Sequence, residues 1–71
     1  MKIENIKIKS ELIINNELIV KVGTNVTIVT ITGEVVMGEL ETIQDKYIYI
    51  SSKSFGRFYM EIDKIESIEI N

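Results

Sequence analysis

The residues of this chain that could do chemistry do not form a catalytic set. Ser51, Ser52 and Ser54 lie close together, but a serine nucleophile needs a base within hydrogen-bond reach, and the 71 residues include no His. The chain also has no Cys, which excludes disulfides and thiolate zinc sites. Glu39 and Glu41 have the spacing of a solvated strand face, so no metal site is expected there. The sequence therefore predicts a protein that is not an enzyme and has no cofactor.

Basic and aromatic side chains alternate at residues 53 to 58, KSFGRF. Lys53 and Arg57 flank Phe55, an arrangement that can hold a phosphate while a base stacks on the ring. However, residues 37 to 71 carry four basic and seven acidic groups, and the whole chain has a net charge of -3. Because nucleic-acid affinity depends on clustered cations, nucleic acid is the less favoured partner, and an ordinary hairpin tip is the competing interpretation.

Two other segments are candidates for protein contacts. Tyr47 and Tyr49 alternate on an outward strand face, and tyrosine is enriched at interfaces; coverage by the N-terminal residues is the alternative. Ile68 and Ile70 belong to an alternating segment, residues 65 to 70, whose free edge can recruit another strand unless its glutamates protect it. Because small cores without disulfides often need a partner subunit, we expect self-association, with another protein as a further partner.

The elements that must position these residues are short strands. Ile and Val are abundant, whereas Ala and Pro are absent. Residues 44 to 46, QDK, and 51 to 56, SSKSFG, have turn composition, and one helical turn is expected at residues 63 and 64. In residues 25 to 32, NVTIVTIT, the apolar alternation changes phase, which indicates a bulge or burial on both faces.

Residues 34 to 43 are expected to form one long strand after a turn at Gly33. Strict alternation places Leu40 on its inner face and Ile43 on the opposite, partly wet face. The predicted core contains Val26, Ile28, Val36, Leu40, Ile48, Ile50, Phe58, Met60 and Ile68.

Residues 1 to 22 form an N-terminal extension with two possible structures. Asn15 and Asn16 between two apolar runs favour a hairpin turn, because Asn tolerates a left-handed backbone. A helix capped by Ser10 is the alternative, although the β-branched content favours strands. Apolar stretches are too short to span a membrane, and the mixed charges of the first residues differ from a signal peptide. A single soluble, cytoplasmic domain without membrane contact is expected.

The order of turns and strands after residue 22 resembles a five-stranded SH3-like barrel, and the spacing of Gly33, Gly38 and Leu40 is similar to the first motif of the Sm-like family. A glycine at a sharp bend lets one strand belong to both halves of such a barrel. The segment GEVVMGEL is also similar to small Sm-like proteins of Gram-positive bacteria. The resemblance implies an all-β small barrel, and it implies a homo-oligomer because Sm-like rings close by pairing the last strand of one subunit with the fourth of the next.

The residues with which this family reads RNA are not matched. The family's acidic residue and asparagine correspond to Gln44 and Ile48, and its pore-lining basic residue and glycine correspond to Glu61 and Ile62. Since fold alone does not specify function, we expect a non-enzymatic assembly or protein-interaction module. The alternative is an Sm-like ring that binds single-stranded RNA through the basic and aromatic residues at positions 53 to 57.

Overall fold

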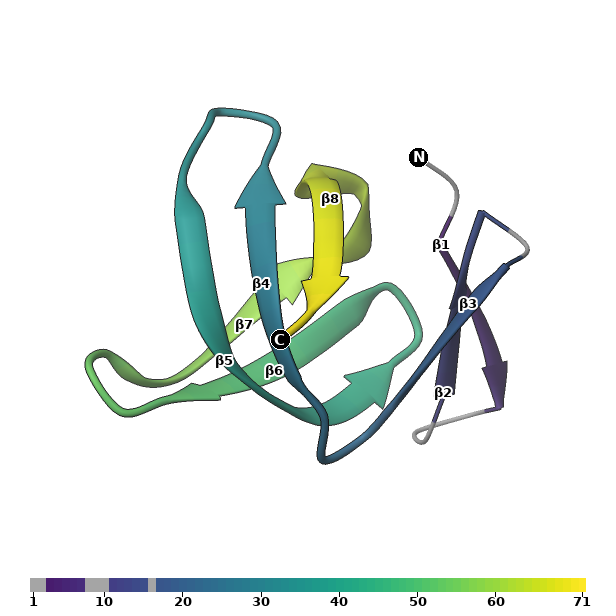
Figure 1. Ribbon diagram of the computed structural model, residues 1–71, viewed down its shortest axis with the longest axis horizontal. Helices are drawn as coiled ribbons and strands as arrows, with labels where there is room; N and C mark the ends of the chain where they lie inside the picture. Colours follow the sequence, from purple (N-terminus) through teal and green to yellow (C-terminus); the bar gives the residue numbers. More distant parts are fainter. Residues whose placement is uncertain (1–2, 8–10, 16) are drawn as a thin grey trace.

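The computed structural model describes residues 3 to 7, 11 to 15 and 17 to 71 (Figure 1). Strands joined by turns make up most of this part of the chain, which confirms the all-β class. They are β1 (Ile3–Lys7), β2 (Glu11–Ile14), β3 (Leu18–Lys21), β4 (Asn25–Thr30), β5 (Val35–Gln44), β6 (Tyr47–Ser52), β7 (Gly56–Glu61) and β8 (Ile65–Ile70). The expected helical turn is present as a 3-10 helix, η1 (Ile62–Lys64). A helix long and apolar enough to cross a membrane is not found among the described residues.

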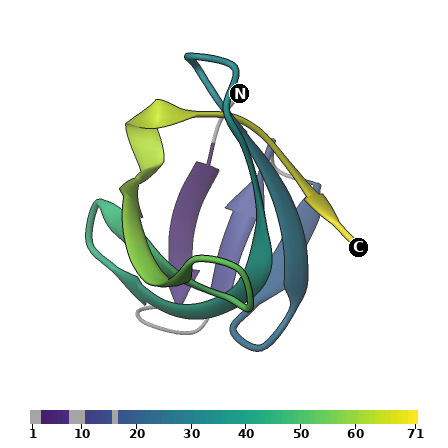
Figure 2. The same ribbon diagram turned by 90° about the vertical axis from the view of Figure 1, so that its left-hand side faces the viewer.

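The strands form two antiparallel sheets, ordered β1-β2-β3 and β7-β6-β5-β4-β8. The five-stranded sheet curves strongly, and the N-terminal sheet lies across one end of it (Figures 1 and 2). Among the described residues, β7 pairs only with β6 and β8 pairs only with β4, so the sheet is open. The expected closed barrel is therefore corrected: β7 and β8 lie at opposite ends of the sheet order and do not pair with each other, and the predicted helical turn η1 lies between them.

The N-terminal segment consists of strands, as its β-branched content favoured. β2 and β3 form a hairpin in which Ile14 faces Leu18, and Asn15 adopts the left-handed φ of 52° that its side chain tolerates. The helical alternative is wrong for the described residues, and β1 adds a strand that the hairpin interpretation did not include. Asn16 and the suggested cap Ser10 lie outside the described residues.

Two glycines give β5 its shape. Gly33 has a φ of 89°, and its N–H donates to the carbonyl oxygen of Thr30, closing the predicted turn before β5. At Gly38, a Cβ atom would lie 2.6 Å from both the Ser51 carbonyl oxygen and the Ile50 Cγ2. Only glycine allows this approach, and close to it β5 changes partners: residues up to Glu39 pair with β4, and residues from Glu39 onward pair with β6.

Two register shifts change which side chains face inward. The pairing of β4 with β8 shifts between Val29 and Thr30, but the additional residue is Glu66 of β8, so the bulge expected within residues 25 to 32 lies on the partner strand. The pairing of β5 with β6 shifts between Leu40 and Thr42, so Glu41 is an additional residue in the strand. Ile43 is consequently fully buried, and its predicted position on the outer face is wrong.

The core joins both sheets. Most predicted core residues are buried, whereas Val36, Phe58 and Met60 are partly buried and pack against the core. The same cluster contains Leu12, Ile14 and Val20 of the N-terminal sheet, together with Ile43 and Ile65. The N-terminal sheet therefore supplies part of the core that the strongly curved sheet cannot complete alone.

Candidate functional site

Three tyrosines form a contiguous surface on the outward side of β6 and β7, here called the tyrosine face (Tyr47, Tyr49 and Tyr59). Tyr59 lies opposite Tyr49 in the strand register, with ring centroids 5.9 Å apart. The ring of Tyr59 also meets that of Tyr47 edge to face, at 5.5 Å. Tyr59 remains 64% exposed and Tyr47 is exposed too, so the N-terminal strands do not cover this pair. The rings fill the space between them, which makes this a contact surface rather than a cage for a ligand.

Arg57 connects the tyrosine face to β5. Its guanidinium carbon lies 4.7 Å from the centroid of the Tyr49 ring, and its Nε forms an ion pair with Glu41. The bulge places Glu41 here, across β6 from Arg57. Both partners are substantially exposed, so solvent screens the pair and its contribution to stability is about 1 kcal/mol or less.

The tip of the β6–β7 hairpin explains the serine cluster. The Ser52 Oγ accepts hydrogen bonds from the N–H groups of Ser54 and Phe55, at 3.2 and 3.3 Å. Ser52 is buried and holds the turn, which gives this serine a structural role. Phe55, at the tip, is 77% exposed.

The structure separates the basic residues that the sequence grouped with Phe55. Arg57 lies in β7 and turns toward the tyrosine face, whereas Lys53 lies in the turn and lines a groove elsewhere. The prediction of one basic and aromatic site is corrected accordingly. Alternation along the segment does not hold across a turn, where backbone dihedrals no longer follow the strand.

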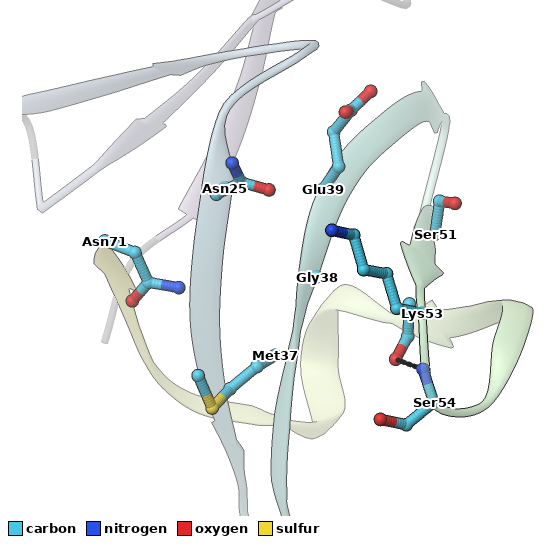
Figure 3. A pocket seen from close by; sticks show the side chains of 9 residues that line it. Asn25, Met37, Gly38, Glu39, Ser51, Lys53, Ser54 and Asn71 are labelled. Atoms are coloured by element: carbon cyan, nitrogen blue, oxygen red, sulfur yellow. Dashed lines mark hydrogen bonds between the residues drawn. The ribbon is translucent and has the colours of Figure 1, made fainter.

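That groove, here called the polar groove, has a volume of about 470 Å³ (Figure 3). Residues of three strands, the hairpin tip and the position after β8 line it, among them Asn25, Met37, Glu39, Ser51, Lys53 and Asn71. Asn25, Glu39 and Ser51 are directly opposite one another across β4, β5 and β6, and Asn71 bonds to Asn25 through its N–H. The sequence alone did not reveal this row, because its members are far apart along the chain.

At the edge of β8 that pairs with no described strand lie the backbone groups of two isoleucines. The Asn71 N–H donates to the Asn25 carbonyl at 3.0 Å, so Asn71 faces β4. Because successive residues of an antiparallel strand face alternate neighbours, the backbone groups of Ile68 and Ile70 point away from β4. The Ile70 side chain is 46% exposed, but that of Ile68 is buried. As a contact candidate, Ile68 is therefore corrected: the whole residue is buried, and Ile70 is the accessible one of the two.

The tyrosine face extends to the outer edge of β7, because Tyr59 lies on this edge strand. The Ile62 N–H donates to the Lys46 carbonyl at 2.8 Å, which continues the β6–β7 register. By the same alternation, the backbone groups of Arg57, Tyr59 and Glu61 point away from β6. Tyr59 is the functional candidate that the sequence interpretation missed, although counting back from the hairpin turn would have placed it beside Tyr49.

The described residues give little support to metal binding or to RNA contacts of the Sm-like kind. Groups of three or more His, Cys, Asp or Glu side chains that could hold a metal are not found among the described residues. Ile48, which the resemblance to Sm-like proteins aligned with an RNA-reading asparagine, is fully buried. No protein-family model matches the chain, and comparisons with curated proteins and with solved structures found no match either.

Proposed function

We propose that this protein is a non-enzymatic assembly module that associates with copies of itself through the free edges of β7 and β8. One observation carries the proposal: at each end of the five-stranded sheet, a residue whose backbone points to the free edge also has a large exposed apolar side chain, Tyr59 on β7 and Ile70 on β8. Unpaired strand edges of this kind recruit further strands.

The architecture that we propose for this module is an open SH3-like or Sm-like barrel. Its support is the strand order β7-β6-β5-β4-β8 together with a β5 that serves both halves of the sheet. Gly33, Gly38 and Leu40 occupy a turn, a close strand contact and the core, which are the roles that the family's motif requires of them.

If the β7 edge of one copy paired with the β8 edge of another, the free backbone hydrogen-bonding groups of both edges would gain partners. In an antiparallel pair, residues that exchange hydrogen bonds carry their side chains on the same face. Pairing β7 with β8 of a second copy therefore brings Tyr59 and Ile70 to one face, where both lose contact with water. Each ladder hydrogen bond contributes about 0.5–1.5 kcal/mol net, and burial of the two side chains adds to this.

Proline at position 70 tests the edge directly. Ile70→Pro removes a backbone donor that faces the free edge and leaves the hydrogen bonds of Glu69 and Asn71 to β4 in place. Ile70→Ala is the matched control, because it shortens the side chain but keeps the N–H. We expect light scattering to give an oligomeric mass for wild type and Ile70→Ala and a monomeric mass for Ile70→Pro, with circular dichroism showing that all three are folded. A folded Ile70→Pro variant with the wild-type oligomeric mass would exclude the β8 edge.

A second candidate function is binding of single-stranded RNA, which the exposed ring of Phe55, two residues after Lys53 in the hairpin tip, favours. Two observations oppose RNA binding. Arg57 is already paired with Glu41, and the small pocket beside η1 is lined by the carboxylates of Asp45 and Asp63, which repel phosphates. A gel-shift titration with oligo-U and oligo-A at low salt separates the two functions. A shift that Phe55→Ala and Lys53→Gln both weaken would support RNA binding, and no shift at high protein concentration would end it.

A further inference from the structure

The polar groove exists because β5 changes partners. The first half of β5 pairs with β4, whereas the β6–β7 hairpin pairs with the second half, so the hairpin tip diverges from β4 and β5 at Gly38. In Figure 3, Lys53 at this tip and Asn71 beside β4 lie on opposite sides of the groove. The groove is thus a direct consequence of the bend, and its lining residues differ from those of the tyrosine face.

Two hydrogen-bond donors are directed into this space. The Lys53 ammonium extends from the tip toward Gly38 (Figure 3), and the Ser52 hydrogen bonds to Ser54 and Phe55 hold the turn that carries it. Among the described residues, no ion pair joins Lys53 to a carboxylate. The Asn71 Oδ1 accepts a hydrogen bond from the Thr27 hydroxyl at 2.6 Å, which leaves the two N–H groups of that amide for a ligand.

The remaining lining limits the charge and shape of a ligand. Met37 is 60% exposed and offers apolar contact next to the donors. Glu39 lines the groove as well, and Glu69 lies opposite Thr27 on β8. These carboxylates oppose any anion in the groove, and a doubly charged phosphate more than a singly charged carboxylate, so binding must come from direct contacts with Lys53 and Asn71.

We infer that the polar groove binds the carboxylate of an acidic side chain in an extended peptide, with Lys53 and Asn71 as donors and Met37 against a neighbouring apolar side chain. The amide of Asn25 presents both a donor and an acceptor, which suits a peptide bond beside the carboxylate. This inference is independent of self-association, because the residues that carry it differ from the edge residues Tyr59 and Ile70.

The probe is the blocked tripeptide acetyl-Leu-Asp-Leu-amide, compared with acetyl-Leu-Asn-Leu-amide at constant ionic strength. Amide chemical shifts of the ¹⁵N-labelled protein report the binding position. We expect saturable shifts at Ser51, Lys53, Ser54 and Asn71 with the aspartyl peptide, and several-fold weaker binding of the asparaginyl peptide. Equal binding of the two peptides, or shifts elsewhere only, would overturn the inference.

Two variants should shift binding in opposite directions, and a third, distant charge variant separates a local contact from a general effect of net charge. Lys53→Gln should weaken binding of the aspartyl peptide about two- to fivefold, as expected for an exposed charge pair. Glu39→Gln should strengthen it by a similar factor, and Lys46→Gln, at the β5–β6 turn, is the matched control without effect. Weaker binding in Glu39→Gln would show that Glu39 attracts the peptide instead of repelling its carboxylate, and would overturn the assignment. Tighter binding of inorganic phosphate than of the peptide would reject the peptide carboxylate as ligand.

Discussion

The two sheets of this protein bury side chains in the same core but obtain their shapes differently. The five-stranded sheet contains the close contact at Gly38 and two register shifts, whereas the N-terminal sheet consists of short strands with one register shift and a left-handed turn at Asn15. The N-terminal sheet nevertheless contributes fully buried residues to the core. A segment with the sequence pattern of an extension is therefore a structural part of the domain, because a chain of this size has little apolar surface to spare.

The largest loss of stability should come from shortening a buried side chain in the core of either sheet. Leu12 and Leu40 are both fully buried, so Leu12→Ala and Leu40→Ala should each lower the free energy of unfolding by about 2–5 kcal/mol in urea titrations. If Leu12→Ala costs less than about 1 kcal/mol while Leu40→Ala has its full effect, the N-terminal sheet contributes little to the cooperative core.

A smaller loss is expected at the bend that only the five-stranded sheet has. The Cβ of Gly38→Ala would lie 2.6 Å from the carbonyl oxygen of Ser51, so β5 and β6 must separate, at a cost of about 1–3 kcal/mol. Gly33→Ala is the matched control: nothing lies within 4 Å of its Cβ, and only its positive φ is strained. Thermal unfolding of both variants separates the two causes, and an unchanged Tm for Gly38→Ala would contradict the close contact.

The free energy of unfolding should also depend on the turn at Asn15 in the N-terminal sheet. Asn15 has a φ of 52°, so Asn15→Ala should lose about 1 kcal/mol, because alanine tolerates this conformation less well. Asn15→Gly keeps the conformation accessible and should unfold close to wild type. Chemical denaturation of the three proteins checks this order, and equal stability of the alanine and glycine variants would argue against the left-handed turn.

The smallest effects on stability are expected on the outer faces, where the two sheets should differ in assembly. Ile19 is exposed on β3, and Ile19→Thr should change the free energy of unfolding by about 0.5 kcal/mol or less and leave the solution mass unchanged. Tyr59→Thr removes the ring at the β7 edge and should lower the mass at equal protein concentration. Sedimentation of both variants measures the difference, and a lower mass for Ile19→Thr would move the contact surface to the N-terminal sheet.

Local signals in the sequence predicted much of the fold. Alternation around Ile48 and Ile50, the turns at Gly33 and after Gln44, and the helical turn before β8 depend on neighbouring residues, and these predictions are confirmed. Ile43 was misplaced because a bulge is a property of the pairing between β5 and β6, which the sequence of β5 does not contain. The burial of Leu12 has the same origin, since it results from packing between two sheets.

The candidate site was only partly predictable for a related reason. Tyr47 and Tyr49 were found from alternation, but their contacts with Tyr59 depend on the register of a hairpin. Lys53 and Arg57 are close in sequence and diverge in space, whereas Asn25 and Asn71 are distant in sequence and meet beside the polar groove. Spacing along one strand is informative, and spacing across a turn or between edges is not.

The most direct test of self-association through the sheet edges is the solution mass of the wild-type protein, measured by light scattering at concentrations of tens of micromolar. The exposed Tyr59 and Ile70 on unpaired edges predict a mass that is a multiple of the 8.1 kDa chain and falls to one chain in Ile70→Pro. A wild-type mass equal to a single chain across this concentration range would contradict the proposal.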